Sequence, residues 1–377
     1  MYIRRTLENK ILNEQIDKGK VIVIYGARRT GKTTLVNKLK EKLNKKTLLL
    51  KCDLAADRDA LSADSLQAQE NLWKDNKVII IDEAQRKKEI GLILKIAIDN
   101  FPDKNFIVTG SSALELSGDI TEPLTGRKFT NYLYPISLRE LIAQQSEGYV
   151  TKRVNEYLRF GLYPEIFSLA REQEKQSYLS SITEDYLFKD VLQYKDIRKP
   201  DILPKLLKLL AYQVGNEVSF HELGTKLGID QQTVQSYVDL LEKAFVIYRL
   251  KAFSRNLRNE INTKEKIYFI DIGIRNALIG DFNDPTIRAD AGGIWENFVI
   301  SERLKKRHYE NIPGNMYFWR TYQKGEIDLV EEREGKLFGY EIKKSSKRKA
   351  KAPKAWQENY ENSSWELISP DNFLKLI

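Results

Sequence analysis

The stretch that decides the fold is Val21-Ile22-Val23-Ile24-Tyr25-Gly26-Ala27-Arg28-Arg29-Thr30-Gly31-Lys32-Thr33-Thr34. Its first five residues are an apolar run typical of a buried strand. The next nine contain the pattern G-x-x-x-x-G-K-[ST], and a helical pattern follows over residues 35–39. Glycines in such a loop let backbone N–H groups surround a phosphate group, and the following helix adds the positive end of its dipole. The stretch therefore predicts a strand, a phosphate-binding loop and a helix.

The loop residues predict a site for ATP or ADP with Mg²⁺. Lys32 is expected to reach the β- and γ-phosphates, and the Thr33 hydroxyl is expected to ligate the metal ion. The backbone of the loop would supply most other contacts. The expected nucleotide contacts are Gly26, Ala27, Arg28, Arg29, Thr30, Gly31, Lys32, Thr33 and Thr34.

A second apolar run, residues 78–81, ends in Asp82 and Glu83. We expect Asp82 to join the Mg²⁺ shell, and Glu83 to orient or deprotonate the attacking water. Taken alone, the run could be a buried strand that ends in two solvated acids. The phosphate loop makes that interpretation the weaker one. Because the chain has two histidines, any acid–base chemistry is expected to use carboxylates, lysine or water.

Two further residues are candidates for the same catalytic site. The run 106–108 ends in Thr-Gly-Ser-Ser, and Ser111 is the hydroxyl we select for contact with the γ-phosphate or the water. A helix-capping role fits Ser111 equally well. Arg127 could act as an arginine finger, in cis or from a neighbouring subunit of a homo-oligomer, or it could be an ordinary surface arginine. The predicted catalytic residues are Lys32, Glu83, Ser111 and Arg127.

Apolar runs alternate with helical patterns between residues 20 and 135. The runs cover residues 21–25, 47–50, 78–81 and 106–108. Continuous apolar strands separated by helices indicate a parallel sheet buried on both faces, and therefore the α/β class. Residues from about 137 to 215 have helical patterns, and a long helix followed by alternating strands is predicted from about residue 290. The length of 377 residues predicts two or three domains.

Composition bounds the class of protein. No apolar run approaches the ~18 residues of a membrane span, and the first residues do not resemble a secretory signal. Cys52 is the only cysteine, which excludes a disulfide within the chain. We therefore expect a cytoplasmic protein without a membrane partner. The net charge of +9 allows a polyanionic partner but does not require one.

The motifs together resemble a known family. The segments that carry the resemblance are Gly-Ala-Arg-Arg-Thr-Gly-Lys-Thr from residue 26, Ile-Asp-Glu-Ala-Gln from 81, Thr-Gly-Ser-Ser from 109, Thr-Gly-Arg from 125, Leu-Tyr-Pro-Ile-Ser-Leu-Arg-Glu from 133, Phe-Gly-Leu-Tyr-Pro-Glu from 160 and Gly-Ile-Trp-Glu-Asn from 293. They are similar to prokaryotic AAA-type P-loop ATPases that carry a C-terminal domain of unknown function. The resemblance implies an ATPase domain at 1–145, a helical lid or linker at 146–205, a winged-helix domain at 206–285 and a small α/β restriction-endonuclease-like domain at 286–377.

The residues between 219 and 270 also indicate a winged helix by themselves. A short helix at 219–229 precedes a turn, and a second helix at 231–245 places apolar residues on one face. Its other face has Gln231, Gln232, Gln235 and Ser236, which could reach base edges. The flanking loop offers phosphate contacts at Lys251, Arg255, Arg258, Lys264 and Lys266. A role in packing or subunit contact fits this segment about as well as DNA binding.

The C-terminal segment contains a predicted hairpin with acids and a lysine. Residues 326–330 and 338–343 are the two strands, and period-two alternation places Glu326 beside Asp328, and Glu341 beside Lys343. With Glu296 on the preceding helix, the pattern looks like the D…E-x-K pattern of restriction-endonuclease-like nucleases. The predicted nuclease residues are Glu296, Asp328, Glu341 and Lys343, with Mg²⁺ on Asp328 and Glu341. Acid–lysine alternation on an exposed strand is the competing interpretation.

A basic stretch follows this hairpin. Seven of the twelve residues from 343 to 354 are Lys or Arg, so the stretch is a candidate for contact with a nucleic-acid backbone or a solvated segment. The leading hypothesis is an ATPase whose cycle drives or gates a DNA-binding C-terminal half. The alternatives are a nucleotide switch or protein-remodelling ATPase without nucleic acid, and an ATP-gated DNA nuclease.

Overall fold

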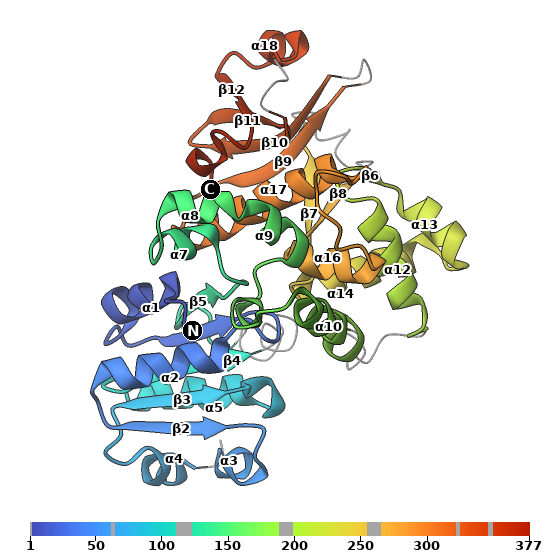
Figure 1. Ribbon diagram of the computed structural model, residues 1–377. Coiled ribbons are helices and arrows are strands. Elements are labelled where there is room, and N and C mark those ends of the chain that lie inside the picture. The colour runs from blue at the N-terminus through green and yellow to red at the C-terminus, as the bar shows by residue number, and fades with distance from the viewer. Residues whose placement is uncertain are drawn as a thin grey trace. The chain divides into compact units, whose positions relative to one another are not determined.

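The structure is a computed structural model that describes residues 2–61, 65–110, 123–187, 199–254, 265–321, 325–345 and 350–377 (Figure 1). It divides into two compact units. The first unit contains residues 1–136 and 243–245, and the second contains residues 137–242 and 246–377. Within the described residues, no helix combines the length and the apolar character needed to cross a membrane.

The first unit is built on a five-stranded parallel sheet. Its strands are β1 (Val21–Tyr25), β2 (Thr47–Lys51), β3 (Val78–Asp82), β4 (Asn105–Gly110) and β5 (Lys128–Tyr132), in the order β2-β3-β4-β1-β5. The helices are α1 (Thr6–Lys10), η1 (Ile11–Gln15), α2 (Lys32–Leu43), α3 (Ala55–Ala60), α4 (Leu66–Trp73), η2 (Ala84–Arg86) and α5 (Ile90–Asn100). Every residue of β1, β3 and β4 is buried, which explains their continuous apolar runs. The α/β class and the P-loop NTPase sheet are confirmed.

The sequence pattern missed the fifth strand. β5 reads Lys-Phe-Thr-Asn-Tyr and lies at the edge of the sheet beside β1. Only one of its five residues is buried, and three of the five are polar, so the strand lacks the continuous apolar run of a central parallel strand. An edge position therefore hid this strand from a search for apolar runs.

The second unit is built on a seven-stranded mixed sheet. Its strands are β6 (Glu217–Val218), β7 (Ile247–Ala252), β8 (Glu265–Phe269), β9 (Asn315–Arg320), β10 (Glu326–Arg333), β11 (Lys336–Ile342) and β12 (Ser363–Ile368). Their order is β12-β11-β10-β9-β7-β8-β6, and β7 pairs with β9 in parallel. The predicted hairpin is confirmed as β10 and β11, joined by a turn in which Glu334 and Gly335 both have positive φ.

Helices surround this sheet. They are α7 (Leu138–Ile142), α8 (Glu147–Lys152), α9 (Val154–Phe160), η3 (Pro164–Phe167), α10 (Glu172–Ser181), η4 (Ile182–Leu187), α12 (Ile202–Tyr212), α13 (Phe220–Leu227), α14 (Gln231–Lys243), α16 (Ile272–Ile279), α17 (Ala291–Tyr309), α18 (Lys354–Asn359) and η5 (Phe373–Lys375). The predicted helices at 219–229 and 231–245 are α13 and α14. The second prediction was two residues too long, because α14 ends at Lys243 and Phe245 has positive φ.

The boundaries predicted at residues 145, 205 and 285 stay predictions. The seven-stranded sheet continues across residue 285, since β6, β7 and β8 precede it and β9 to β12 follow it. A buried carboxylate also joins distant segments of this unit. Asp271 accepts hydrogen bonds from the N–H groups of Leu162, Gly273 and Ile274. Gly161 has a φ of +67°, and a Cβ there would come within 2.0 Å of an Asp271 oxygen, so a residue without a side chain is required.

Candidate functional site

The phosphate loop lies between the carboxyl end of β1 and the first residue of α2. The φ of Gly31 is +95°, which favours glycine, and Arg29 also has positive φ. A Cβ on Gly26 would lie 2.3 Å from the carbonyl oxygen of Leu133, so only glycine fits this close approach of two chain segments. Lys32 Nζ donates hydrogen bonds to the carbonyl oxygens of Gly26 (2.9 Å) and Ala27 (3.0 Å). The lysine therefore lies across the loop that the motif predicts will hold phosphate.

The loop is supported by a residue that the sequence analysis did not select. Arg5 is buried, and its guanidinium donates hydrogen bonds to the carbonyl oxygens of Thr30 (2.8 Å) and Tyr134. It therefore ties the phosphate loop to the segment that follows β5. No local pattern marks this role, because an arginine near the N-terminus reads as a surface residue.

Asp82 and Thr33 come together beside the loop. Thr33 Oγ1 donates a hydrogen bond to Asp82 Oδ2 over 2.8 Å. The other carboxylate oxygen of Asp82 accepts a hydrogen bond from the hydroxyl of Thr109, at the end of β4. Because β4 lies between β1 and β3 in the sheet, its end is next to both motifs. A hydroxyl and a carboxylate so placed are the pair of ligands that a P-loop site offers to Mg²⁺.

Thr109 also fixes the residue after Asp82. The N–H of Glu83 donates to Thr109 Oγ1 over 3.1 Å, and the Glu83 backbone has a positive φ of 54°. Glu83 Oε2 accepts a hydrogen bond from Gln85 Nε2 over 2.5 Å. Thr109 is therefore the β4 hydroxyl that contacts the two acids. The sequence did signal a hydroxyl at this strand end, but it gave no means of choosing among three.

The two remaining candidates are Ser111 and Arg127. Ser111 lies outside the described residues. Arg127 immediately precedes β5, at the edge of the sheet where the parallel strands begin, whereas the phosphate loop follows the end of β1. Its Nε pairs with Asp99 Oδ1 over 2.8 Å, and both side chains are exposed. This placement removes a finger in cis, because the strand length of about 16 Å separates the two edges. A finger in trans stays a prediction.

The second unit brings all four nuclease-like residues together. Leu329 of β10 pairs with Tyr340 of β11 in the antiparallel register. Asp328 and Glu341 occupy the next position along the two strands, on opposite sides of the hairpin. Lys343 Nζ lies 2.6 Å from Glu341 Oε1 and 3.5 Å from Asp328 Oδ2. The N–H of Ile342 donates to the same Asp328 oxygen over 2.8 Å. The register of β10 against β9 shifts between Ile327 and Val330, and such an irregularity re-aims the side chains beside it.

Glu296 is linked to Asp328 by the buried Lys266, which pairs with both acids. The sequence had suggested a different role for this lysine. Lys266 Nζ lies 3.1 Å from Glu296 Oε1, 2.9 Å from Glu326 Oε1 and 3.6 Å from Asp328 Oδ1. Its exposed fraction is 1%, so the prediction that Lys266 contacts a DNA phosphate was wrong. The hydroxyl of Tyr268, on the same face of β8, donates to Glu296 Oε1 over 2.6 Å. We call Lys266, Tyr268, Glu296, Glu326, Asp328, Glu341 and Lys343 the acid–lysine cluster.

Burial and mutual repulsion change the protonation of this cluster. Burial, and then the charge of Asp328, raises the pKa of Glu296 to about 7, although Lys266 and Tyr268 oppose the change. Burial and Asp328 also raise the pKa of Glu341. Burial alone would lower the pKa of Lys266, but the charges of Glu296, Asp328 and Glu326 raise it instead. Lys266 therefore stays charged, whereas Glu296 and Glu341 take up a proton more readily than ordinary glutamates do.

The motif at the start of α17 positions Glu296. A Cβ on Gly293 would lie 2.8 Å from the carbonyl oxygen of Val214, so this glycine allows close packing of the helix. Asn297 is buried, and its side chain exchanges two 2.7 Å hydrogen bonds with the backbone N–H and carbonyl of Phe269. These contacts hold α17 against β8, the strand that carries Lys266 and Tyr268.

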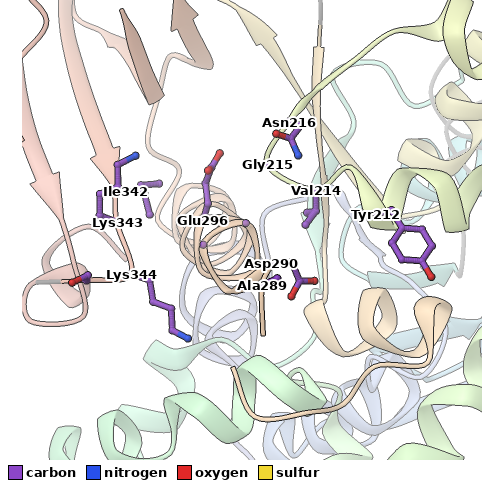
Figure 2. Close-up of a pocket in the computed structure, with 13 residues that line it drawn as sticks. Tyr212, Val214, Gly215, Asn216, Ala289, Asp290, Glu296, Ile342, Lys343 and Lys344 are labelled. Carbon is purple, nitrogen blue, oxygen red and sulfur yellow. The ribbon is translucent and has the colours of Figure 1, made fainter. Parts of the chain in front are cut away.

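Glu296 and Lys343 also line an open pocket of about 640 Å³ (Figure 2). Its lining comes from three segments of the second unit: residues 212–216, residues 289–296 at the start of α17, and residues 342–345 after β11. Within the described residues, no three His, Cys, Asp or Glu side chains form a ready-made metal site. Glu341 Oε2 is nevertheless buried without a hydrogen-bond partner. Its residue lies opposite Asp328 on the neighbouring strand of the hairpin.

The predicted base-reading face of α14 is on the surface. Gln231, Gln232, Gln235 and Ser236 are exposed, whereas Val234, Tyr237, Val238 and Leu241 are buried. Among the basic residues proposed as phosphate contacts, Lys251 is exposed. Arg255, Arg258 and Lys264, and Lys347, Arg348 and Lys349 of the basic stretch, lie outside the described residues.

Comparison with known families divides the chain into three matches. Residues 18–142 match a family described as "AAA domain". This part of the chain has the P-loop NTPase fold and is similar to ATPase domains of the AAA type. Residues 151–284 and 291–370 match two families that are each described as a domain of unknown function, DUF8612 and DUF4143. The protein is therefore an ATPase that binds and hydrolyses ATP, and its C-terminal half is similar to two families whose descriptions assign no activity.

Similar proteins share this arrangement over most of their length. An uncharacterised protein of Mycobacterium tuberculosis is 27% identical over 350 residues, covering 92% of this chain and 75% of the relative. An uncharacterised protein of Methanocaldococcus jannaschii is 27% identical and covers 92% and 83% of the two chains. Among solved structures, a Walker-type ATPase of Pyrococcus abyssi matches with a TM-score of 0.51, 16% identity, and coverage of 74% of this chain and 96% of that one. This structural similarity supports the fold.

Proposed function

We propose that the ATPase couples Mg²⁺-dependent ATP hydrolysis to nucleic-acid binding by its second unit. The observation that carries the proposal is the acid–lysine cluster, which lies beside an open pocket that Lys343 and Lys344 line. A buried set of carboxylates held by lysines is expensive to build, and in proteins such groups concentrate at functional sites. The positive charge beside it suits a phosphate backbone.

In the first unit, the residues of the loop would divide the work of hydrolysis. Mg²⁺ would neutralise phosphate charge, and the Thr33 hydroxyl and Asp82 carboxylate, 2.8 Å apart, are the groups that fit it. Lys32 would exchange its two carbonyl contacts for phosphate oxygens. Glu83, held by Gln85 and by Thr109, would orient or deprotonate the attacking water.

A second candidate function is Mg²⁺-dependent cleavage of nucleic acid by the second unit. It is favoured by Glu341 Oε2, which is buried without a hydrogen-bond partner and lies across the hairpin from Asp328. These two carboxylates would hold the ion, which would polarise the phosphate. The ammonium of Lys343 faces both acids. In this candidate function it would hold a non-bridging oxygen of the phosphate bound beside them.

The winged helix is part of this proposal. α14 is tied to β7 by Arg249, which pairs with Asp239 and Glu242 of the helix. α14 also exposes amide and hydroxyl side chains that could contact base edges. The helix itself has one basic residue, Lys243, so its affinity for DNA would depend on other basic segments of the chain, such as residues 343–354.

The deciding experiment measures ATP turnover with and without DNA. We expect single-stranded or duplex DNA to raise kcat, and we expect Lys32→Ala to abolish tight nucleotide binding. ATP turnover that no nucleic acid changes, together with no binding of DNA or RNA at low salt in any nucleotide state, would favour the nucleotide switch or protein-remodelling alternative.

The nuclease candidate has a separate test. Plasmid and single-stranded DNA are incubated with Mg²⁺ or Mn²⁺, and products are compared for the wild type and Asp328→Ala. We expect the substitution to abolish cleavage and leave ATP hydrolysis intact, since the residues belong to different units. Cleavage that survives Asp328→Ala would assign the activity to another site or to a contaminant.

A further inference from the structure

An exposed tyrosine stands on the wall of the pocket that the acid–lysine cluster adjoins. Tyr212 is the last residue of α12, and its exposed fraction is 59% (Figure 2). Among the described residues, only Ile287, at 77%, is a more exposed large apolar side chain, and it lies two residues before the pocket-lining Ala289. The exposed ring of Tyr212 therefore leaves an aromatic surface on the pocket wall that a ligand could cover.

The pocket also offers groups that bind phosphate and polar ring atoms. Lys343 and Lys344 lie on the wall formed by the residues after β11, and Figure 2 shows that wall across the pocket from Tyr212. Lys344 Nζ donates a hydrogen bond to the carbonyl oxygen of Pro285, which fixes the position of the side chain. This partner is uncharged, so the contact does not neutralise the ammonium. Asn216 is exposed on the pocket wall, where its amide can both donate and accept.

Lys343 is itself paired with Glu341 over 2.6 Å and lies 3.5 Å from Asp328, so the charge available to a phosphate is chiefly that of Lys344. Asp290 pairs with Arg275 over 2.6 Å and with Arg288 over 2.8 Å, so its charge is already balanced. Glu296 is balanced in the same way by Lys266. A Cβ on Gly292, which also lines the pocket, would meet open space, so no side chain fills the volume next to it. The cavity of about 640 Å³ is within the range of roughly 300–1,000 Å³ that small-molecule sites occupy.

We propose that this pocket binds one unpaired nucleotide of a nucleic-acid strand, with its base stacked on Tyr212 and its phosphate facing Lys343 and Lys344. A base within a duplex is stacked on both faces, so an aromatic side chain can reach its ring only when the base is unpaired or at a strand end. The inference rests on the proposed nucleic-acid role of the second unit, and it narrows the substrate to single strands and frayed ends.

The test uses the full chain and a short single-stranded DNA that contains 2-aminopurine, whose fluorescence falls when the base stacks. We expect Tyr212→Ala to weaken binding of this strand by roughly 5- to 150-fold, the range for loss of one base–aromatic stack. Tyr212→Phe keeps the ring and should bind within a few-fold of the wild type. Tyr149→Ala is the matched control, because Tyr149 is also exposed, at 43%, and belongs to the same unit outside the pocket.

Lys344→Gln tests the other wall. It should leave the fluorescence quenching of the bound strand unchanged and reduce the slope of log K against log salt by about 0.7, the contribution of one phosphate of a single strand. A free nucleotide is the other possible source of the same chemistry. In a Lys32→Ala background, where the ATP site is disabled, free adenosine monophosphate should bind far more weakly than the strand.

The outcomes separate the inference from the function on which it rests. Binding of duplex and single strands alike, unaffected by Tyr212→Ala and without quenching, would overturn the inference and leave nucleic-acid binding standing. Tight binding of free nucleotide with no preference for a strand would make the pocket a mononucleotide site and also overturn it. Failure of the wild type to bind any nucleic acid would remove the proposed function, and the inference with it.

Discussion

Replacing Lys266 by methionine tests whether the acid–lysine cluster depends on its buried ammonium group. Methionine keeps an unbranched side chain of similar length, so the packing beneath Phe318 changes little, whereas the positive charge is lost. Lys266 has an exposed fraction of 1%, and its three carboxylate partners lie within 2.9–3.6 Å.

The expected loss follows from which partners are left without compensation. Glu326 is about one-third exposed, so water replaces much of what the lysine gave it. Glu296 keeps the Tyr268 hydroxyl, and Asp328 keeps Lys343 and the N–H of Ile342. Removing one member of a buried ion network costs about 3–5 kcal/mol. Because each acid keeps a partner, we expect the lower end, about 3 kcal/mol.

Urea unfolding followed by tryptophan fluorescence measures this loss of unfolding free energy, and it reports mainly on the second structural unit. The chain has five tryptophans, and all except Trp73 belong to the second unit. With a slope of about 2 kcal/mol per M, the expected loss lowers the midpoint by roughly 1.5 M. Lys226→Met is the matched control. Its pair with Glu222 is also short, at 2.7 Å, but both side chains are more than half exposed, so it should cost no more than about 0.5 kcal/mol.

A double substitution identifies the cause of the loss. Glu296→Gln added to Lys266→Met removes one of the acids that lost the lysine and should recover about 1 kcal/mol, a coupling that two independent sites would not show. ATP turnover should stay near the wild-type rate in all three variants. A midpoint for Lys266→Met that matches the Lys226→Met control would refute the reasoning, because the buried ammonium would then contribute no more than a surface lysine.

Substitutions at four other residues have defined outcomes. Glu83→Gln should keep ATP binding and lower kcat by about 10²–10⁴-fold, measured by phosphate release, and normal turnover would remove its catalytic role. Thr109→Val should lower kcat by roughly 10- to 100-fold with ADP affinity unchanged, and Thr109→Ser should restore it. Arg127→Ala should lower kcat only if it serves a neighbouring subunit, in which case mixing it with Lys32→Ala chains should recover activity. Burial alone would raise the pKa of Asp290, but hydrogen bonds and charge from its arginine partners lower it to about 2. Its carboxylate therefore stabilises the fold above pH ~4 and loses this contribution as pH falls towards 2, so Asp290→Asn should cost about 1–2 kcal/mol at pH 7 and little at pH 2 in denaturant titrations.

The ATP site could be predicted from the sequence because its parts are local. The loop residues are contiguous, and one apolar strand delivers Asp82 and Glu83 together. What could not be predicted depends on contacts between distant segments. Thr109 acquires its role because β4 lies between β1 and β3, and Arg5 acquires its role because the N-terminal segment crosses the loop. Neither arrangement leaves a periodic trace in the residues.

The second cluster shows the same division. Alternation within one hairpin was sufficient to place Asp328, Glu341 and Lys343 near one another. Lys266 was predicted to be exposed, since lysine is almost never fully buried unless it is paired. Its partners come from α17 and β10, which lie more than twenty residues further along the chain. A cue was available in the spacing of Lys266 and Tyr268, which share one face of β8, but no partner could be named before the sheet was known.

The continuous sheet of the second unit changes how its two family matches are understood. The matches divide the unit at about residue 285, yet β7 pairs with β9 across that point and places Lys266 of β8 beside acids of α17 and β10. The acid–lysine cluster therefore exists only when both matched segments fold together. The pocket has the same property, because Tyr212 and Asn216 come from one segment and Lys343 and Lys344 come from the other. A nucleic-acid strand that contacts α14 and a nucleotide bound in the pocket would thus be held by the same folded domain. Any coupling between base contacts and the cluster would then need no hinge between the two segments.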